Sequence, residues 1–529
     1  MTAMLLLLLL VGCFSSAAAT TTARDNMCAA GRFDPGPMEG PWATFRGDEL
    51  GTNWTVESVE GCCALCAADA SAGSPECTAW DFKYDRQLCC LYAGTPTLAP
   101  EPHQRSSYGT RFGSPPPAPP STEAVLGTLA SVNGYFQSPD PLAEPGGPGK
   151  MANNDWTGGV YMAGNMAHFR ASRNASLLEY GVRWGDSHKW QPAGYRGCHG
   201  TQGCPDNICC GQGFAEIYAE KKNATFVAAL RLAIESAVQH PCAVARNDSQ
   251  RKDSDMCWWW VDALFMALPT FARVGALAET PAAASRIWDA GRVRYNTTAH
   301  GINASGASAF NLWSAKDQLF FRDDSFLQQK TPSGAPVFWA RWAGASPSMH
   351  TRPCQLHAAY IYLTCLTRRG RGNGWAFAAM ARTLDALPPS RVADRAEYGG
   401  KLQLMAVKLK QLQGADGCWR SSLEDPGQFP NIETSGTSLI VFGLAWGVNH
   451  GLLAHADYGA AAIKGWECLA RPSPVGAVAR GGLLGWCQPG GASPNGAATH
   501  NSTSDFCVGS FLLGGSELAT MLKKRPAAV

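Results

Sequence analysis

Asp262 has the sequence surroundings of a general acid. It lies in segment 257–266, which reads Cys-Trp-Trp-Trp-Val-Asp-Ala-Leu-Phe-Met. A carboxyl group among indole rings must be paired, hydrogen-bonded or protonated, because burial favours the neutral form and raises the pKa of such a group. A general acid that works near neutral pH needs this property. We therefore expect Asp262 to deliver a proton to a bound substrate.

Four other short polar motifs lie, like Asp262, just before or at the start of apolar helical stretches. They are Asp155-Trp156-Thr157, Asp206-Asn207, Arg371-Gly372-Asn373-Gly374-Trp375 and Glu433-Thr434-Ser435-Gly436. If the helices start at the same face of one domain, these side chains converge on one pocket. The alternative for each motif is helix capping, since such side chains accept hydrogen bonds from free N–H groups. We favour capping for Thr434 and Ser435.

Helices dominate the chain from residue 124 onward. Apolar residues recur at three- and four-residue spacing, with glycine-rich loops between the periodic stretches. Clear examples are residues 226–238, 258–277, 375–387, 402–412, 438–453 and 458–469. Two segments, 258–268 and 439–446, are apolar nearly all round, as the inner helices of a closed ring would be. The pattern predicts a mainly α domain over residues 124–522, in which a ring of helical hairpins buries its inner helices.

A separate cysteine-rich module precedes this domain, at residues 24–112. Its seven cysteines indicate a small domain held by disulfides, and their odd number leaves one to pair elsewhere or stay free. They are Cys28, Cys62, Cys63, Cys66, Cys77, Cys89 and Cys90. The spacing resembles the PAN/apple module, an α+β domain that binds proteins or glycans and has no catalytic activity. A metal site is the less favoured alternative. The proline-rich segment 113–123 predicts a stiff linker.

Composition and the first residues point to the secretory pathway. Residues 1–19 have the layout of a signal peptide, with a short apolar run followed by small residues. The 20 cysteines and seven Asn-X-Ser/Thr sequons agree with an oxidising, glycosylating compartment. The net charge of +2 gives no basic excess for nucleic-acid binding, and no later segment is long enough to span a membrane. We expect a protein that is secreted or resides in the endomembrane lumen.

Seven motifs in residues 124–520 resemble glycoside hydrolase family 105 and occur in that family's order. They are segments 206–212, 258–267, 319–323, 371–375, 416–423, 433–436 and 485–489. The resemblance implies an (α/α)6 toroid, a six-hairpin barrel, which agrees with the helical pattern. The related family 88, the unsaturated glucuronyl hydrolases, shares this fold and chemistry. Cys418 and Cys487 replace bulkier apolar groups in two motifs, so a disulfide or a reshaped subsite is expected there.

The resemblance also implies a reaction and roles for particular residues. The substrate would carry a terminal uronic acid with a C4=C5 double bond, and Asp262 would protonate C4 and then activate the water that adds at C5. Asp206 matches the family's second carboxylate. Arg371 suits the substrate carboxylate, because a guanidinium group can bind it through two hydrogen bonds. Further substrate-binding candidates are Trp375 and Trp419 as stacking platforms, with core packing equally open for Trp375, and His199 in the loop Cys198–Cys204. We expect no metal or cofactor.

An extra segment interrupts one of these motifs. Family members join the two halves of the motif directly, whereas here Arg341 and Gly372 are separated by residues 342–371. Either Arg341 or Arg371 could therefore supply the guanidinium group. The segment is a retained intron or a lineage-specific loop, and we expect a variant without it to fold and stay active. A non-catalytic glycan-binding or adhesion protein is the alternative function, and the presence of both Asp206 and Asp262 favours the enzyme.

Overall fold

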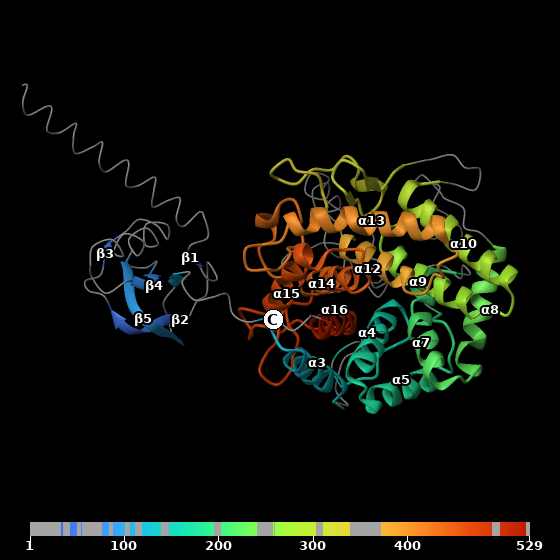
Figure 1. The fold of residues 1–529 in the computed structure, drawn as a ribbon, viewed down its shortest axis with the longest axis horizontal. Helices are drawn as coiled ribbons and strands as arrows, with labels where there is room; N and C mark the ends of the chain where they lie inside the picture. The colour runs from blue at the N-terminus through green and yellow to red at the C-terminus, as the bar shows by residue number, and fades with distance from the viewer. Residues whose placement is uncertain are drawn as a thin grey trace, which may run out of the picture. The chain divides into compact units, whose positions relative to one another are not determined.

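The computed structural model describes six strands between Phe33 and Arg111 and most residues after residue 118 (Figure 1). The latter are residues 119–138, 149–194, 203–240, 260–302, 310–338, 372–488 and 498–524, with positions 147 and 258. The chain divides into two compact units, Met1–Pro119 and Pro120–Val529. Among the described residues, no helix combines the length and apolar character required to cross a bilayer.

The first unit contains an antiparallel sheet. Its strands are β1 (Phe33–Asp34), β2 (Ala43–Glu49), β3 (Trp54–Thr55), β4 (Cys77–Lys83), β5 (Leu88–Pro100) and β6 (Ser106–Arg111). The strand order is β1-β6-β4-β5-β2, and β3 pairs with β5. The long strand β5 thus pairs with three others and organises the sheet. The small sheet expected for this module is present, whereas its expected helix and cysteine pairings lie outside the described residues.

The second unit is built from two concentric sets of helices (Figure 1). The inner helices are α4 (Trp156–Ser172), α7 (Gly211–Lys221), α9 (Ala263–Ala276), α12 (Asn373–Leu384), α14 (Thr434–Asn449) and α16 (Asp505–Lys523). The outer helices are α3 (Thr122–Gln137), α5 (Ala175–Ser187), α8 (Thr225–Gln239), α10 (Pro281–His300), α13 (Val392–Gln411) and α15 (His455–Ala470). Each inner helix contacts the next, and α16 closes the ring against α4. The predicted (α/α)6 toroid is confirmed.

Burial separates the two sets of helices. In α14 every residue from Thr434 to Gly447 is buried, and in α9 every residue from Ala263 to Gly275 is buried. The outer helix α5 buries one stripe only, consisting of Leu177, Tyr180, Gly181, Trp184 and Gly185. That spacing is the i, i+3, i+4, i+7 pattern of an amphipathic helix. Apolar side chains all round a helix therefore marked the inner ring correctly.

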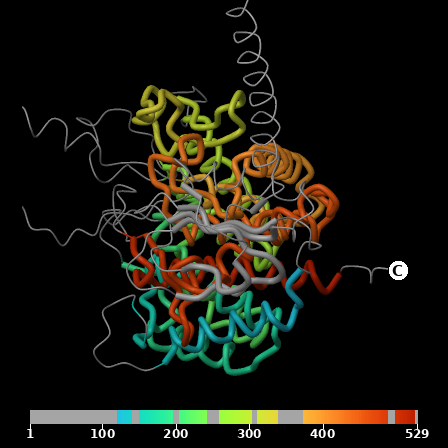
Figure 2. Tube along the Cα trace, turned by 90° about the vertical axis from the view of Figure 1, so that its left-hand side faces the viewer, coloured from blue at the N-terminus to red at the C-terminus, as the bar shows by residue number. Residues whose placement is uncertain are grey.

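Helix α16 packs closely against its two inner neighbours, α4 and α14. Figure 2 shows the red C-terminal helix passing between the teal helices and the orange and yellow segments. A Cβ atom added to Gly164 of α4 would lie 2.2 Å from the Gly509 carbonyl oxygen of α16. These two backbones touch, and only a residue without a side chain allows that approach. The close contact fixes the start of α16 relative to the start of α4.

Two helices begin at positions that the sequence pattern did not predict. Helix α9 begins at Ala263 and not at Trp258, because Trp258 has a left-handed backbone conformation with φ of 69°. Its carbonyl oxygen accepts a 2.7 Å hydrogen bond from the Thr298 hydroxyl. Helix α13 begins at Val392, ten residues before the predicted start at Leu402. Its first half is mostly polar and buries only Asp394, Tyr398 and Gly399, so it lacks the apolar repeat by which the second half was predicted.

A buried ion network links the inner helices through Glu216 of α7. The Glu216 carboxylate pairs with Arg170 at 2.9 Å, Arg273 at 2.9 Å and Arg382 at 2.8 Å. Burial alone would raise the pKa of Glu216, but the three guanidinium groups hold it well below its usual range. Arg382 also donates a 2.6 Å hydrogen bond to Gln212. The arginines lie in the C-terminal halves of α4, α9 and α12, where helix dipoles favour cations.

Candidate active site

A carboxylate or amide side chain lies at the start of every inner helix. Asp155, Asp262 and Glu433 are the N-caps of α4, α9 and α14, Asn373 and Asp505 begin α12 and α16, and Asp206 lies in the short helix α6 (Pro205–Ile208) just before α7. Successive inner helices are separated by one outer helix that returns the chain, so all six run in the same direction. Their starts therefore share one end of the ring, which we call the acidic rim.

Asp262 is fully buried within this rim. Its backbone carbonyl oxygen accepts the Phe265 N–H at 2.9 Å and so begins α9. Gly372 passes directly against it. A Cβ atom added to Gly372 would lie 1.9 Å from Val261 Cγ1 and 3.2 Å from Asp262 Oδ1. Because any larger residue would collide with Val261, glycine is required where the 372–375 motif meets the proposed acid.

The segment around the short strands β7 (Trp313–Ser314) and β8 (Leu319–Phe320) is attached to the rim at two points. The Asn373 side-chain amide donates to the Phe320 carbonyl oxygen at 2.9 Å, and the Phe320 N–H donates to Asn373 Oδ1 at 2.8 Å. The Val261 N–H donates to the Arg322 carbonyl oxygen at 2.9 Å. These bonds bring Arg322, which is buried and paired with Asp323, beside the start of α9.

Asp206 reaches the rim from α6, which packs on α9. The Thr270 hydroxyl of α9 donates to the Ile208 carbonyl oxygen at 3.1 Å. Burial and the negative charge of Asp155 raise the pKa of Asp206 to about 7, against the opposing effect of the nearby Arg322. The residue thus titrates near neutral pH. Cys204, two residues earlier, is disulfide-bonded, and its partner is outside the described residues.

A threonine connects two further carboxyl groups across the junction of α4 and α16. Thr157 Oγ1 lies 2.9 Å from Asp155 Oδ1 and 2.7 Å from Asp505 Oδ2. Asp505 is 2% exposed, whereas Asp155 is only partly buried. Burial and the charge of Asp155 raise the pKa of Asp505 to about 7, although the hydrogen bond between Asp505 and Thr157 opposes this shift. Asp155, Asp206 and Asp505 therefore form one electrostatically coupled group.

Glu433 caps α14, a role that the sequence suggested for its neighbours. Its buried carboxylate accepts the Ser435 hydroxyl at 2.8 Å and also the Gly436 N–H. The Thr434 hydroxyl instead donates to the Gly485 carbonyl oxygen at 2.9 Å. The prediction that Thr434 caps the helix is therefore wrong, because its side chain ties the start of α14 to the 485–488 loop.

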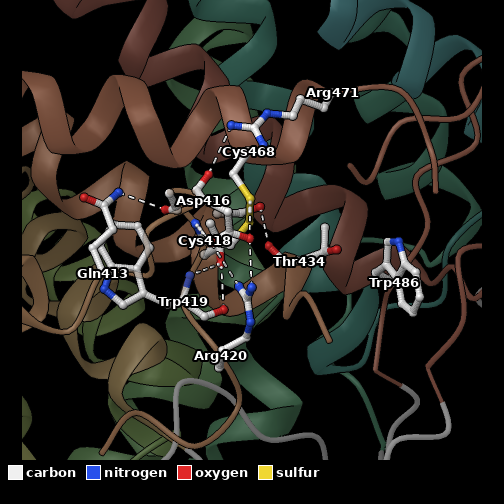
Figure 3. Close-up of a disulfide and its surroundings, with 12 residues drawn as sticks. Gln413, Asp416, Cys418, Trp419, Arg420, Thr434, Cys468, Arg471 and Trp486 are labelled. Carbon is white, nitrogen blue, oxygen red and sulfur yellow. Dashed lines mark hydrogen bonds and ion pairs between the residues drawn. A yellow bond between two sulfur atoms is a disulfide. The ribbon is translucent and has the colours of Figure 1, made fainter. Parts of the chain in front are cut away.

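Two disulfides hold the loops near this end of the ring. Cys418 pairs with Cys468 of α15, and Cys487 pairs with Cys507 of α16, which confirms a disulfide at both unusual positions. Figure 3 shows the first pair, with Asp416 and Arg420 beside it at a nitrogen–oxygen distance of 2.8 Å. The Asp416 carboxylate and the sulfurs of Cys418 and Cys468 are close together. Both sulfurs are bonded to each other, so this trio does not offer thiolate ligands to a metal.

The structure places the other predicted site residues as follows. Trp375 is fully buried in α12, with its ring 4.8 Å from that of Phe265, and belongs to the core. Trp419 is also fully buried, and its indole N–H donates to the Leu409 carbonyl oxygen at 2.7 Å. A buried ring offers no face to a sugar, so we do not retain either tryptophan as a stacking platform. Arg341, Arg371, His199 and the whole 342–371 segment lie outside the described residues.

Two residues of the rim were not predicted from the sequence. Arg322 lies in the motif at residues 319–323, but nothing local in the sequence indicates that its backbone meets the start of α9. Asp505 was not singled out, although it precedes an apolar stretch as Asp155 and Asp262 do. That shared position was the available signal. The contact of Asp505 with Thr157 spans 348 residues of sequence and is not visible locally.

The fold and the acidic rim define a six-hairpin helical toroid of the kind found among glycoside hydrolases. The chain belongs to glycosyl hydrolase family 88, whose sequence pattern matches residues 132–345 and 368–522. The match leaves out residues 346–367, which fall inside the extra segment 342–371. In the first unit, residues 42–114 match the PAN domain. The resemblances that the motifs carried are confirmed.

Known relatives agree with this assignment. An unsaturated 3S-rhamnoglycuronyl hydrolase from Formosa agariphila is 30% identical over 280 residues, which are 52% of this chain and 61% of that protein. The chain thus spans about three-fifths of that relative. The solved structure of a glycosyl hydrolase family 88 protein from Bacteroides vulgatus has a TM-score of 0.58 and 26% identity, covering 76% of this chain and all of that one. A structure described as a polysaccharide lyase has a TM-score of 0.59 and 25% identity, covering 77% and 99%.

Proposed function

We propose that this protein is an unsaturated uronyl hydrolase that removes a terminal 4,5-unsaturated uronic acid from oligosaccharides left by polysaccharide lyases. The observation that carries the proposal is the presence of both Asp206 and Asp262 at the acidic rim, in α6 and at the N-cap of α9, two helices that pack against each other. Family membership and the named function of the Formosa relative support it. We further propose an oxidising compartment as its site of action, since the Cys418–Cys468 and Cys487–Cys507 disulfides require one.

The proposed reaction is hydration of a vinyl ether. Asp262 gives its proton to C4, and the resulting carboxylate takes a proton from the water whose oxygen bonds to C5. The product is a hemiketal at C5, which opens when its C5–O5 bond breaks. The hemiacetal at C1 then collapses to an aldehyde and releases the sugar partner. One acid/base group suffices, so the two-carboxylate distances of ordinary glycosidases do not apply.

Other rim residues have distinct proposed roles. Asp206 has a pKa near neutral pH, so its carboxyl group can donate a hydrogen bond to a sugar hydroxyl when protonated and accept one when ionised. Arg322 supplies a guanidinium group close to Asp206 and to the start of α9. Whether Arg341 or Arg371 binds the substrate carboxylate stays open, and both remain candidates with His199. A chain that binds glycans without turnover is not favoured, because such a protein needs no buried acid at the end of its ring.

The test is to incubate the protein with unsaturated disaccharides and follow the ultraviolet absorbance of the C4=C5 bond. A hydrolase of this kind removes that absorbance, whereas a polysaccharide lyase, as one similar structure is described, creates it from saturated polymer. The absorbance change thus has opposite signs for the two activities, and this difference distinguishes a hydrolase from a lyase. A panel of rhamnogalacturonan, glucuronan, ulvan and glycosaminoglycan fragments would define the substrate. No absorbance loss with any member of the panel would refute the proposal.

Substitution of Asp262 tests the mechanism. Asp262→Asn keeps the side-chain volume but cannot deliver a proton, and we expect turnover to fall by about 100-fold or more, the usual contribution of general acid catalysis. The matched control is Asp289→Asn on the outer helix α10, whose side chain is 60% exposed and pairs with Arg391. The control should turn over substrate normally. A folded Asp262→Asn variant with near-normal activity would remove Asp262 from the mechanism.

A further inference from the structure

The contact between Thr157 and two carboxyl groups constrains where protons lie at the acidic rim. A hydroxyl group has one hydrogen to donate, yet Thr157 Oγ1 lies within hydrogen-bond distance of both Asp155 Oδ1, at 2.9 Å, and Asp505 Oδ2, at 2.7 Å, with the Asn153 amide oxygen farther away at 3.3 Å. It can donate to only one of these oxygens. If the other carboxyl group carries a proton, it can donate to Thr157, and no two lone pairs face each other across these short contacts. The geometry therefore favours one protonated carboxyl group in this pair.

Burial and existing hydrogen bonds identify Asp505 as the protonated group. Asp505 is 2% exposed, and its other oxygen, Oδ1, already accepts the Phe506 N–H at 2.7 Å. Asp155 is partly exposed, and its Oδ1 accepts the Thr157 N–H at 2.8 Å as the N-cap of α4. A capping carboxylate in contact with water is the better place for the negative charge. The N-terminus of α16 also favours a negative charge, but burial beside a second carboxylate opposes ionisation of Asp505.

The surrounding titratable groups favour the same assignment. Among the described residues, Asp505 interacts with Asp155, with Tyr161 of α4 and with Tyr180 of α5. Each of these groups is neutral or negative, so none stabilises a carboxylate at position 505. Glu433 caps α14, the other inner neighbour of α16, and is also an acid. The described contacts of α3 and α15 with α16 at Gly515 are apolar, through Leu129 and Trp466.

We propose that Asp505 is a positioning residue that retains its proton, donates a hydrogen bond to Thr157 Oγ1, and thereby fixes Asp155 as the carboxylate beside Asp206. The inferred chain runs from the Asp505 carboxyl to the Thr157 hydroxyl and on to the Asp155 carboxylate. The charge of Asp155 is one of the causes that raise the pKa of Asp206 to about 7. A residue on the last inner helix thus sets the protonation of Asp206 without contacting the substrate. This inference rests on the proposed function, in which Asp206 holds a sugar hydroxyl.

The decisive variant is Asp505→Asn, because an amide is the isostere of a protonated carboxyl group. Its NH2 group can donate to Thr157 and its oxygen can accept from Phe506, but it cannot ionise. We expect this variant to keep kcat within about threefold of the wild-type value at pH 6, while the alkaline limb of its pH–rate profile loses one ionisation. Asp505→Ala cannot donate and should lose about tenfold or more in kcat, about the worth of one hydrogen bond to a charged network.

Three further variants make the test specific. Thr157→Val breaks the chain at its middle, and the Asp505→Ala/Thr157→Val pair should be no worse than either single change, because both remove the same connection. Ser510→Ala is the matched control. Ser510 is buried on α16, but its hydroxyl bonds to its own helix at the Phe506 carbonyl oxygen, 2.8 Å away. Its pH–rate profile should match that of the wild type.

A measurement without substrate separates this inference from the proposed function. Infrared difference spectroscopy with labelled aspartate counts protonated carboxyl groups at pH 6, and Asp505→Asn should remove one buried carboxyl band. If the wild-type protein acts on no unsaturated oligosaccharide but Asp505→Asn removes the carboxyl band, the proposed function fails and the protonation of Asp505 stands. If the band persists, if Asp505→Asn loses as much activity as Asp505→Ala, or if its alkaline limb is unchanged, Asp505 does not act in this way.

Discussion

Gly372 offers the sharpest test of how the 372–375 motif supports Asp262. A Cβ atom at this position would lie 1.9 Å from Val261 Cγ1, far inside the contact distance of two carbon atoms, and 3.2 Å from Asp262 Oδ1. Gly372→Ala must therefore push Val261 and the start of α9 apart. Overpacking of this kind costs about 1–3 kcal/mol of stability.

The effect on catalysis should be larger than the effect on stability. A displacement of about 1 Å in a catalytic group costs about 100-fold in rate, and Val261 is adjacent to Asp262 in the chain. Urea unfolding measures the first effect, and kcat on an unsaturated disaccharide measures the second. Gly134→Ala on α3 is the control, because nothing lies within 4 Å of its added Cβ. That change should stabilise the helix by about 0.5–1 kcal/mol.

A compensating substitution decides whether the collision is the cause. Val261→Ala removes the atom that the new Cβ would strike, at a cost of about 2 kcal/mol for two buried methyl groups. The Gly372→Ala/Val261→Ala double variant should be more stable than the sum of the two single losses by about 1–2 kcal/mol. It should also recover most of the lost rate. If Gly372→Ala is as stable and active as the wild type, or if the double variant shows no recovery, the proposed contact does not exist.

Three other predictions follow from the described contacts. A variant that begins at Pro120 should show unchanged kcat and KM on unsaturated disaccharides, because every motif of the site lies in the second unit; a much lower kcat in a folded protein would contradict this. Loss of the Cys418–Cys468 disulfide, which spans 50 residues, should lower the free energy of unfolding by about 4 kcal/mol. Loss of the Cys487–Cys507 disulfide, which spans 20 residues, should lower it by about 3 kcal/mol. Serine substitutions followed by urea unfolding would measure both effects. Glu216→Gln leaves three guanidinium groups without their anion and should cost about 3–5 kcal/mol of stability, with little change in kcat once folded; equal stability by the same unfolding measurement would contradict that network.

The sequence by itself determined the class of fold and the proposed acid. Apolar side chains all round segments 258–268 and 439–446 indicated inner helices, because only a helix covered on every side can bury such a surface. Asp262 was identifiable because a carboxyl group among indole rings requires a special environment. The order of the motifs indicated the family. These features are local in sequence or repeat along it, so they need no knowledge of distant contacts.

The tertiary structure decided which side chains meet. Trp375 and Trp419 are aromatic residues in family motifs, and only the packing of α12 and α15 showed that both belong to the core. Asp505 and Thr157 are 348 residues apart, and their contact depends on the closure of the ring between α4 and α16. No local pattern encodes such a contact, because it follows from the positions of all the helices between them. The burial of Asp505, its hydrogen bond with Thr157 and its raised pKa are consequences of that closure.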